Sequence, residues 1–298
     1  NGRWMLTFGR QDDDAPASPQ ALAQAHWPTM EARVPGNVEL DLVSAGVLRE
    51  PSIGNHVYDL LDCEAYRWWY RRTFRTPSLE PGQRVLLRFD GLDCLGTIYV
   101  NGQSIGSTDN MFIEHQFDIT SQLASGVEND LTVRIDSAVL AGRRHQPGPE
   151  EWANAANWEA LDIRKAPHMY GWDIMPRIVS AGLWRGVSLV ILDPTHWRHV
   201  YWATRTVDSN RRTATVLADW EFASDHREFS DLHVQLTLSR HGQVIHESEH
   251  SVTHTHGQAH LTLDDIDLWW PRGYGVPALY HASAKLMDQD GRILAEHV

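Results

Sequence analysis

Short runs of alternating hydrophobic and polar residues recur along the whole chain, with Gly, Asn and Asp between them. Clear examples are residues 84–89, 97–100 and 131–135. Alternation with a period of two places apolar side chains on one face of a strand, and regular turn residues are typical of antiparallel sheets. Helix-type periodicity is scarce, so the pattern predicts an all-β protein and argues against a parallel α/β fold.

Two local signals add detail to this picture. Asn101-Gly102 separates the runs 97–100 and 103–105, and this pair favours a type I′ hairpin because both central positions need positive φ. Asn37 can cap a short helix over residues 38–45 that ends at Gly46. We therefore predict a tight hairpin at 101–102 and one short helix near the N-terminus.

The strand pattern breaks once, at Asp193-Pro194, and a new set of strands begins near Val200. A chain of 298 residues suits two domains, so we expect the first at residues 1–194 and the second at 195–298. Strand spacing in the second part is that of an immunoglobulin-like sandwich of about 100 residues. Residues 292–298 look like an unfinished strand, which suggests a chain cut short.

Composition excludes several functional classes. The formal net charge of −13 argues against nucleic-acid binding, because contact with phosphates requires Lys and Arg. No apolar run approaches the roughly 20 residues that a membrane-spanning helix needs. The first residues lack the pattern of a signal peptide, so the sequence does not indicate a compartment.

The only cysteines are Cys63 and Cys94. Two cysteines exclude a disulfide-rich scaffold and a four-thiolate zinc site. We expect two free, buried thiols, since free cysteine is usually buried, although one disulfide remains possible from the sequence.

Histidines are the only candidates for metal binding. His250, His254, His256 and His260 share parity, and His254 with His256 could project from one face of a strand at a spacing that suits zinc. No third ligand is evident nearby. A polar, solvent-facing surface is therefore the expected role, and no metal or cofactor is predicted.

Other conspicuous residues also have structural explanations. Asp90 and Asp93 flank Gly91 and are expected to shape a turn, and Glu150-Glu151 is expected at a solvated loop tip. Adjacent strand residues face opposite sides, so one Trp of each adjacent pair is expected to pack in a core or between domains. These pairs are Trp68-Trp69 and Trp269-Trp270.

A long stretch with little strand pattern, residues 141–180, is rich in Trp and charge. Loops of this length inside a compact domain are usually functional. The most distinctive part runs from Arg164 to Asp173, Arg-Lys-Ala-Pro-His-Met-Tyr-Gly-Trp-Asp.

Several strings together resemble the N-terminal domains of family-two glycoside hydrolases, in the β-mannosidase branch. They are Val-Pro-Gly-Asn-Val at 34–38, Trp-Tyr-Arg-Arg-Thr-Phe at 69–74, the 164–173 string, and Leu-Trp-Trp-Pro-Arg-Gly-Tyr-Gly at 268–275. The resemblance implies a jelly-roll, galactose-binding-like β-sandwich followed by an immunoglobulin-like β-sandwich. Ile174 and Met175 depart from the family pattern, which usually continues with Trp and Gly.

The resemblance also implies an exo-acting, retaining parent enzyme, most simply a β-mannosidase, whose two catalytic carboxyl groups lie on a downstream barrel. Its acid/base is a Glu preceded by Asn, and this chain contains no Asn-Glu dipeptide. We therefore expect no catalytic residue here and no hydrolysis by this chain alone.

In such enzymes the loop that carries Gly-Trp-Asp contacts the terminal sugar, so Trp172 and Asp173 are the expected substrate-binding residues. Arg164 and Lys165 are expected to orient Asp173 or to touch the substrate. The expected partner is a terminal β-linked sugar, a mannoside first, held together with the barrel. Alternatively, Asp173 pairs with Arg164 or Arg177 and only anchors the loop. The chain as a whole could also be a stand-alone carbohydrate-binding module or a structural module with an exposed aromatic surface.

Overall fold

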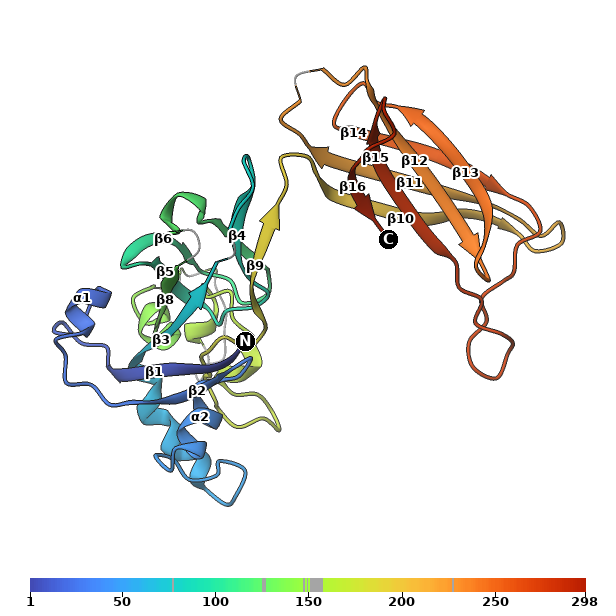
Figure 1. Ribbon diagram of the computed structural model, residues 1–298. Coiled ribbons are helices and arrows are strands. Elements are labelled where there is room, and N and C mark those ends of the chain that lie inside the picture. Colours follow the sequence, from blue (N-terminus) through green and yellow to red (C-terminus); the bar gives the residue numbers. More distant parts are fainter. Residues whose placement is uncertain (77, 125–126, 147, 149, 151–157, 227) are drawn as a thin grey trace. The chain divides into compact units, whose positions relative to one another are not determined.

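The computed structural model describes residues 1–76, 78–124, 127–146, 148, 150, 158–226 and 228–298. The chain forms two compact units, residues 1–191 and 192–298 (Figure 1). Glu151 and Trp152, which belong to the long loop singled out above, lie outside the described residues, so the expected loop tip at Glu150-Glu151 is not tested.

The first unit is built from two sheets. The larger has the strand order β2 (Thr29–Val34), β1 (Gly2–Arg10), β3 (Tyr66–Arg75), β8 (Glu128–Asp136), β5 (Leu95–Val100) and β6 (Gln103–Thr108), and neighbouring strands pair antiparallel. The smaller has the order β7 (His115–Asp118), β4 (Arg84–Phe89) and β9 (Val187–Leu192). The predicted all-β class is confirmed.

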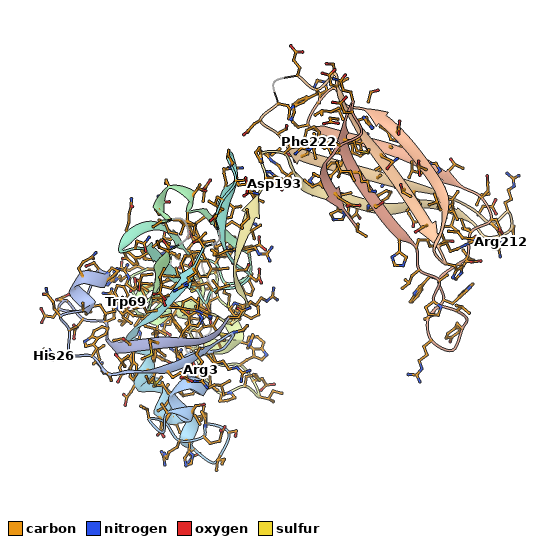
Figure 2. All side chains as sticks on the ribbon, in the orientation of Figure 1. Arg3, His26, Trp69, Asp193, Arg212 and Phe222 are labelled. Carbon is orange, nitrogen blue, oxygen red and sulfur yellow. The ribbon has the colours of Figure 1, made fainter. Side chains whose placement is uncertain are left out.

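Strand β3 shows how alternation distributes the aromatic residues of this unit. Trp68 and Tyr70 join the apolar core with Phe89 from the smaller sheet, whereas Trp69 faces the opposite side of β3. Trp69 (Figure 2) is nevertheless fully buried, and its ring contacts Tyr99 and Arg134. Both members of this pair are therefore buried, where the sequence led us to expect only one in a core.

Both local predictions are confirmed. Strands β5 and β6 form a hairpin in which Asn101 and Gly102 have φ of 51° and 78°, as a type I′ turn requires. The side chain of Asn37 accepts a hydrogen bond of 3.1 Å from the Leu40 amide and caps helix α2 (Val38–Ser44).

The remaining helical segments are short: α1 (Pro19–Leu22), α3 (Ala138–Gly142) and the 3₁₀ segments η1 (His56–Ala65), η2 (Thr120–Gln122), η3 (Trp158–Ala160) and η4 (Pro167–Tyr170). The ten-residue η1 was not predicted, since a search for the 3.6-residue period does not detect 3₁₀ geometry. No helix in the described ranges has the length and apolar character to cross a bilayer.

The second unit is also a pair of antiparallel sheets. One has the order β10 (His196–Asp208), β11 (Thr213–Ala223) and β14 (His256–Leu263), and the other β13 (Gln243–Ser251), β12 (Leu232–Arg240), β15 (His281–Asp288) and β16 (Ile293–His297). Alternate residues of β11 and β12, among them Phe222 (Figure 2), form its separate core.

Both cysteines are free, as predicted. Cys94 is buried and Cys63 only half-buried. Burial raises the pKa of each thiol to about 12, so both are protonated and unreactive at neutral pH.

Candidate functional site

The string singled out in the sequence ends in a tight hairpin, which we call the tip hairpin (Trp172–Met175). The Trp172 amide donates to the Met175 carbonyl at 3.1 Å, and the Met175 amide donates to the Trp172 carbonyl at 3.2 Å. A third hydrogen bond, from the Ile178 amide to the Met169 carbonyl at 2.9 Å, continues the pairing. Asp173 and Ile174 therefore occupy the turn.

The tip hairpin exposes several large apolar side chains to solvent. Trp172 is 69% exposed, Ile174 88% and Met175 46%, and Asp173 is exposed as well. Exposed apolar residues gathered on an ordered loop usually mark a surface that binds something. The Asp173 carboxylate has no hydrogen bond or ion pair to any residue of the described ranges, so the alternative pairing with Arg164 or Arg177 is not observed there.

Arg177 instead clamps the base of the hairpin. Its Nε and Nη2 donate to the two carboxylate oxygens of Glu64 at 2.6 and 2.9 Å, and Nη2 also donates to Glu159 at 2.7 Å. The guanidinium lies over the Tyr170 ring at 5.5 Å. These hydrogen bonds, with Glu64 first, raise the pKa of Arg177. Bidentate pairing of this kind fixes geometry as well as charge, so the hairpin projects from a rigid base.

Lys165 supports the same loop from below. Its side chain is 0% exposed and its Nζ donates to Asp93 at 2.5 Å and to the Ser180 carbonyl at 2.6 Å. Burial raises the pKa of Asp93, and the neighbouring Lys165 ammonium opposes that rise. Lys165 was expected to orient Asp173 or to touch the substrate, but its hydrogen bonds in the described ranges go to Asp93 and Ser180, so the side chain supports the loop from the interior.

Arg164, next to Lys165, has an exposed side chain. Its backbone carbonyl accepts a hydrogen bond of 3.0 Å from the Met111 amide. Of the four expected site residues, the structure thus leaves Trp172, Asp173 and Arg164 accessible and seals Lys165 in the interior.

An apolar cavity of about 490 Å³, which sequence reasoning did not find, lies beside the hairpin. Its lining comes from stretches far apart in the chain and includes Met111, Ala166, Met169, Met175, Ile178 and Trp184. Because Met175 also belongs to the tip hairpin, the cavity and the hairpin form one continuous surface. Only the fold brings these residues together.

The remaining candidates have other surroundings. Asp93 pairs with Lys165 and Asp90 with Arg88, so each aspartate has its own ion-pair partner and the buried Asp93 supports the loop. Trp269 and Trp270 are both exposed in the second unit. The expectation of core packing is wrong for this pair, and packing between domains stays a prediction.

Histidines of the second unit lie on a polar surface. His199 and His256 each bond Asp219 through Nε2, at 2.9 and 3.2 Å, whereas His254 is exposed and precedes β14. Within the described part of the chain, no group of three potential ligands could hold a metal ion. Of the four histidines in the predicted spacing, His256 bonds the Asp219 carboxylate, whereas His250 bonds the Ser248 hydroxyl at 3.0 Å.

Comparison with known proteins matches both units. The family described as "Glycosyl hydrolase 2 galactose-binding domain-like" matches residues 7–185, and "Glycosyl hydrolases family 2" matches residues 195–298. Beta-mannosidase B of Aspergillus clavatus is 34% identical over 264 residues, which are 86% of this chain and 30% of that protein. Beta-mannosidase B of Aspergillus fumigatus is 33% identical over 276 residues, 91% of this chain and 32% of that protein.

Solved structures of related enzymes also superpose on this chain. The crystal structure of a β-D-mannosidase from Dictyoglomus thermophilum superposes with a TM-score of 0.77 at 28% identity, covering 99% of this chain and 34% of that one. A Bifidobacterium dentium β-glucuronidase, at 24% identity and a TM-score of 0.64, covers 100% of this chain and 47% of that one and shares the fold. The chain thus spans about 30% of the length of the curated relatives. It belongs to glycoside hydrolase family 2, with a galactose-binding-like domain and an immunoglobulin-like domain homologous to the N-terminal third of β-mannosidase B.

Proposed function

We propose that this chain forms the scaffold and one wall of the terminal-sugar pocket of an exo-acting, retaining β-mannosidase. The tip hairpin carries the proposal, because it presents an exposed indole beside an exposed, unengaged carboxylate on a rigid base. An indole face can cover the apolar side of a pyranose, while a carboxylate accepts hydrogen bonds from neighbouring hydroxyls. Trp172 and Asp173 would act together on one sugar ring, with Arg164 at the edge and Lys165 holding the loop.

Bond cleavage would take place on another part of the protein. Retaining hydrolysis needs two carboxyl groups about 5 to 5.5 Å apart on a rigid frame. A (β/α)₈ barrel that supplies such a frame takes about 250 residues, and the curated relatives are roughly three times longer than this chain, whose share of them is about 30%. We therefore expect the 298-residue chain alone to be inactive on p-nitrophenyl β-mannoside.

The decisive experiment uses the longest reading frame that contains this chain. With p-nitrophenyl β-mannoside as substrate, Asp173→Asn should lower kcat/KM by roughly ten- to a hundredfold, because a lost hydrogen bond to a charged group costs about 1.5–3 kcal/mol. Asp162→Asn is the matched control, since Asp162 is an exposed carboxylate of the same loop that pairs with His145 instead. The control should keep the activity of the parent.

Two results would overturn the proposal. One is equal activity of the Asp173→Asn and Asp162→Asn variants. The other is a long protein that is inactive on the mannoside while the 298-residue chain binds it through Asp173, which would make the chain a stand-alone binding module.

A further inference from the structure

A second hollow lies in the first unit, on the outer face of the six-stranded sheet. Strand register aligns Met5 with Arg71, Thr7 with Trp69 and Arg71 with Thr132. Side chains alternate along a strand, so these five residues share the face opposite the apolar core. They form the floor of a groove of about 710 Å³.

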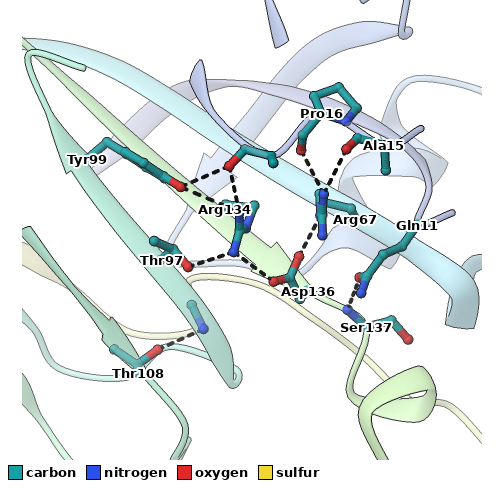
Figure 3. Close-up of polar contacts among 12 residues, drawn as sticks. Gln11, Ala15, Pro16, Arg67, Thr97, Tyr99, Thr108, Arg134, Asp136 and Ser137 are labelled. Atoms are coloured by element: carbon teal, nitrogen blue, oxygen red, sulfur yellow. Dashed lines mark hydrogen bonds and ion pairs between the residues drawn. The ribbon is translucent and has the colours of Figure 1, made fainter. Parts of the chain in front are cut away.

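Residues 11–28, which connect β1 to β2, form a cover over this face. Arg67 donates to the carbonyls of Ala15 and Pro16 at 3.3 and 2.7 Å, and Arg134 donates to that of Ala17 at 2.7 Å (Figure 3). Asp136 holds both arginines, at 2.6 Å from Arg67 and 3.1 Å from Arg134. The cover is therefore fixed to the sheet by a network of charged groups.

The far end of the cover supplies an aromatic wall. Trp27 packs so closely on β1 that a Cβ added at Gly9 would lie 2.5 Å from its ring, so the strand needs a glycine there. Gln20, on helix α1, reaches the Gly102 carbonyl at 3.3 Å. Because both ends of the cover are tied to the sheet, the groove is formed before any ligand arrives, which reduces the entropic cost of binding.

The charged side chains at the groove are paired with one another. Arg71 Nε donates to Asp130 at 2.5 Å, and the Thr132 hydroxyl donates to the same carboxylate at 2.9 Å. The Thr7 and Thr29 hydroxyls are 2.8 Å apart. The Arg71 side chain is 65% exposed. Its Nη groups have no hydrogen-bond partner among the described residues, so they are available to a ligand.

We infer that this groove is a second, non-catalytic carbohydrate site that takes a neutral mono- or disaccharide. Its volume lies in the range of about 300–1,000 Å³ that is usual for small-ligand sites. Trp27 and Leu22 offer apolar surface to the C–H face of a sugar ring. Arg71, Asp130 and the Thr7–Thr29 hydroxyls offer polar groups to its hydroxyls. Anionic ligands fit less well, because Asp130 neutralises Arg71 and the chain carries a net charge of −13.

Titration of the 298-residue chain with β-1,4-mannobiose, followed by calorimetry and by amide chemical shifts, tests the inference. A Kd on the order of 1 mM or lower is expected. Arg71→Ala and Trp27→Leu should each raise Kd at least about tenfold, which corresponds to a loss of one or two ligand hydrogen bonds or of ring contact. Cellobiose and glucuronic acid serve as a second neutral probe and a charged probe.

Arg84→Ala is the matched control, because Arg84 is similarly exposed and pairs with Asp118 at 3.5 Å on the smaller sheet of the same unit. It should bind as the parent does, and so should Asp173→Ala, which separates this site from the tip hairpin. The inference fails if no neutral probe binds, if glucuronic acid binds best, if affinity survives both groove substitutions in folded variants, or if Asp173→Ala abolishes binding.

Discussion

Lys165 and Asp93 form an ion pair that is sealed from solvent, with side chains 0% and 4% exposed. Removal of one partner leaves an uncompensated buried charge, which costs roughly 3–5 kcal/mol. Lys165→Met should therefore lower the free energy of unfolding of the first unit by about that amount, measured by urea denaturation.

Two further variants show whether the lost stability comes from breaking the ion pair or from substitution at position 165 itself. The double variant Asp93→Leu/Lys165→Met should recover much of the stability, because it removes both charges at once. Arg49→Met breaks an exposed pair with Asp59 and should leave the free energy of unfolding close to that of the parent, because solvent screens exposed ion pairs. A Lys165→Met variant as stable as Arg49→Met would show that the buried pair does not hold the loop.

Asp41, on helix α2, gives the first unit a pH dependence. Its Oδ1 accepts from the Arg33 amide at 2.9 Å, while Oδ2 is buried without a hydrogen-bond partner in the described ranges. Burial raises the pKa of Asp41 to about 6, and the Arg33 hydrogen bond opposes this. A folded-state pKa above the unfolded value, about 3.9, means that the folded form binds the proton more tightly.

The contribution of Asp41 to stability is therefore complete below about pH 4 and is lost as the pH rises through about 6. Asp41→Asn should remove this loss and flatten the stability curve between those values, with a gain on the order of 2 kcal/mol at pH 7. Chemical denaturation at several pH values measures the free energy of unfolding of the variant and of the parent. A slope of stability against pH that is the same in both would rule out Asp41 as the source of the pH dependence.

At the scale of elements, the features that could be predicted are those whose chemistry is local. The Asn101-Gly102 turn and the Asn37 cap each depend on a few consecutive residues. Segment η1 and the cover over residues 11–28 could not be predicted. The cover is held by Arg67 and Arg134, which lie more than 50 residues away in the chain, and no local pattern encodes such contacts.

The loop between β14 and β15 in the second unit exposes large apolar side chains. The Trp270 amide donates to the Val276 carbonyl at 3.2 Å, and the Tyr280 hydroxyl bonds the backbone of Asp267. This ordered loop leaves Tyr274 80% and Leu279 72% exposed. Such a surface normally contacts another domain or protein.

We expect the 298-residue chain to self-associate through this loop as its concentration rises, and the variant Tyr274→Ser/Leu279→Ser to reduce that association several-fold in sedimentation velocity. Tyr58→Ser is the matched control, since Tyr58 is a 66% exposed aromatic residue of the first unit. Monomeric behaviour of the parent at all concentrations, or an equal effect of the control, would contradict the expectation.

For the molecule as a whole, strand alternation was sufficient to predict the fold class, and motifs spread over most of the chain were sufficient to predict the family. The site could be predicted only in part. The string at 164–173 pointed to the loop, but it did not reveal that Lys165 turns inward to Asp93, 72 residues away in sequence. The apolar cavity and the groove depend on strand register and on long-range packing, which a single sequence does not specify.

In the tip hairpin, different residues serve stability and ligand recognition, two requirements that often conflict in evolving enzymes. Its base is fixed by Arg177, Glu64 and Glu159, while Asp173 and Ile174 at its turn touch no core. If the tip contacts sugar as proposed, substitutions at these two positions would alter selectivity with little effect on folding, because stability and recognition depend on different residues. A library randomised at those two codons would therefore be a compact starting point for changing which glycosides the parent enzyme accepts.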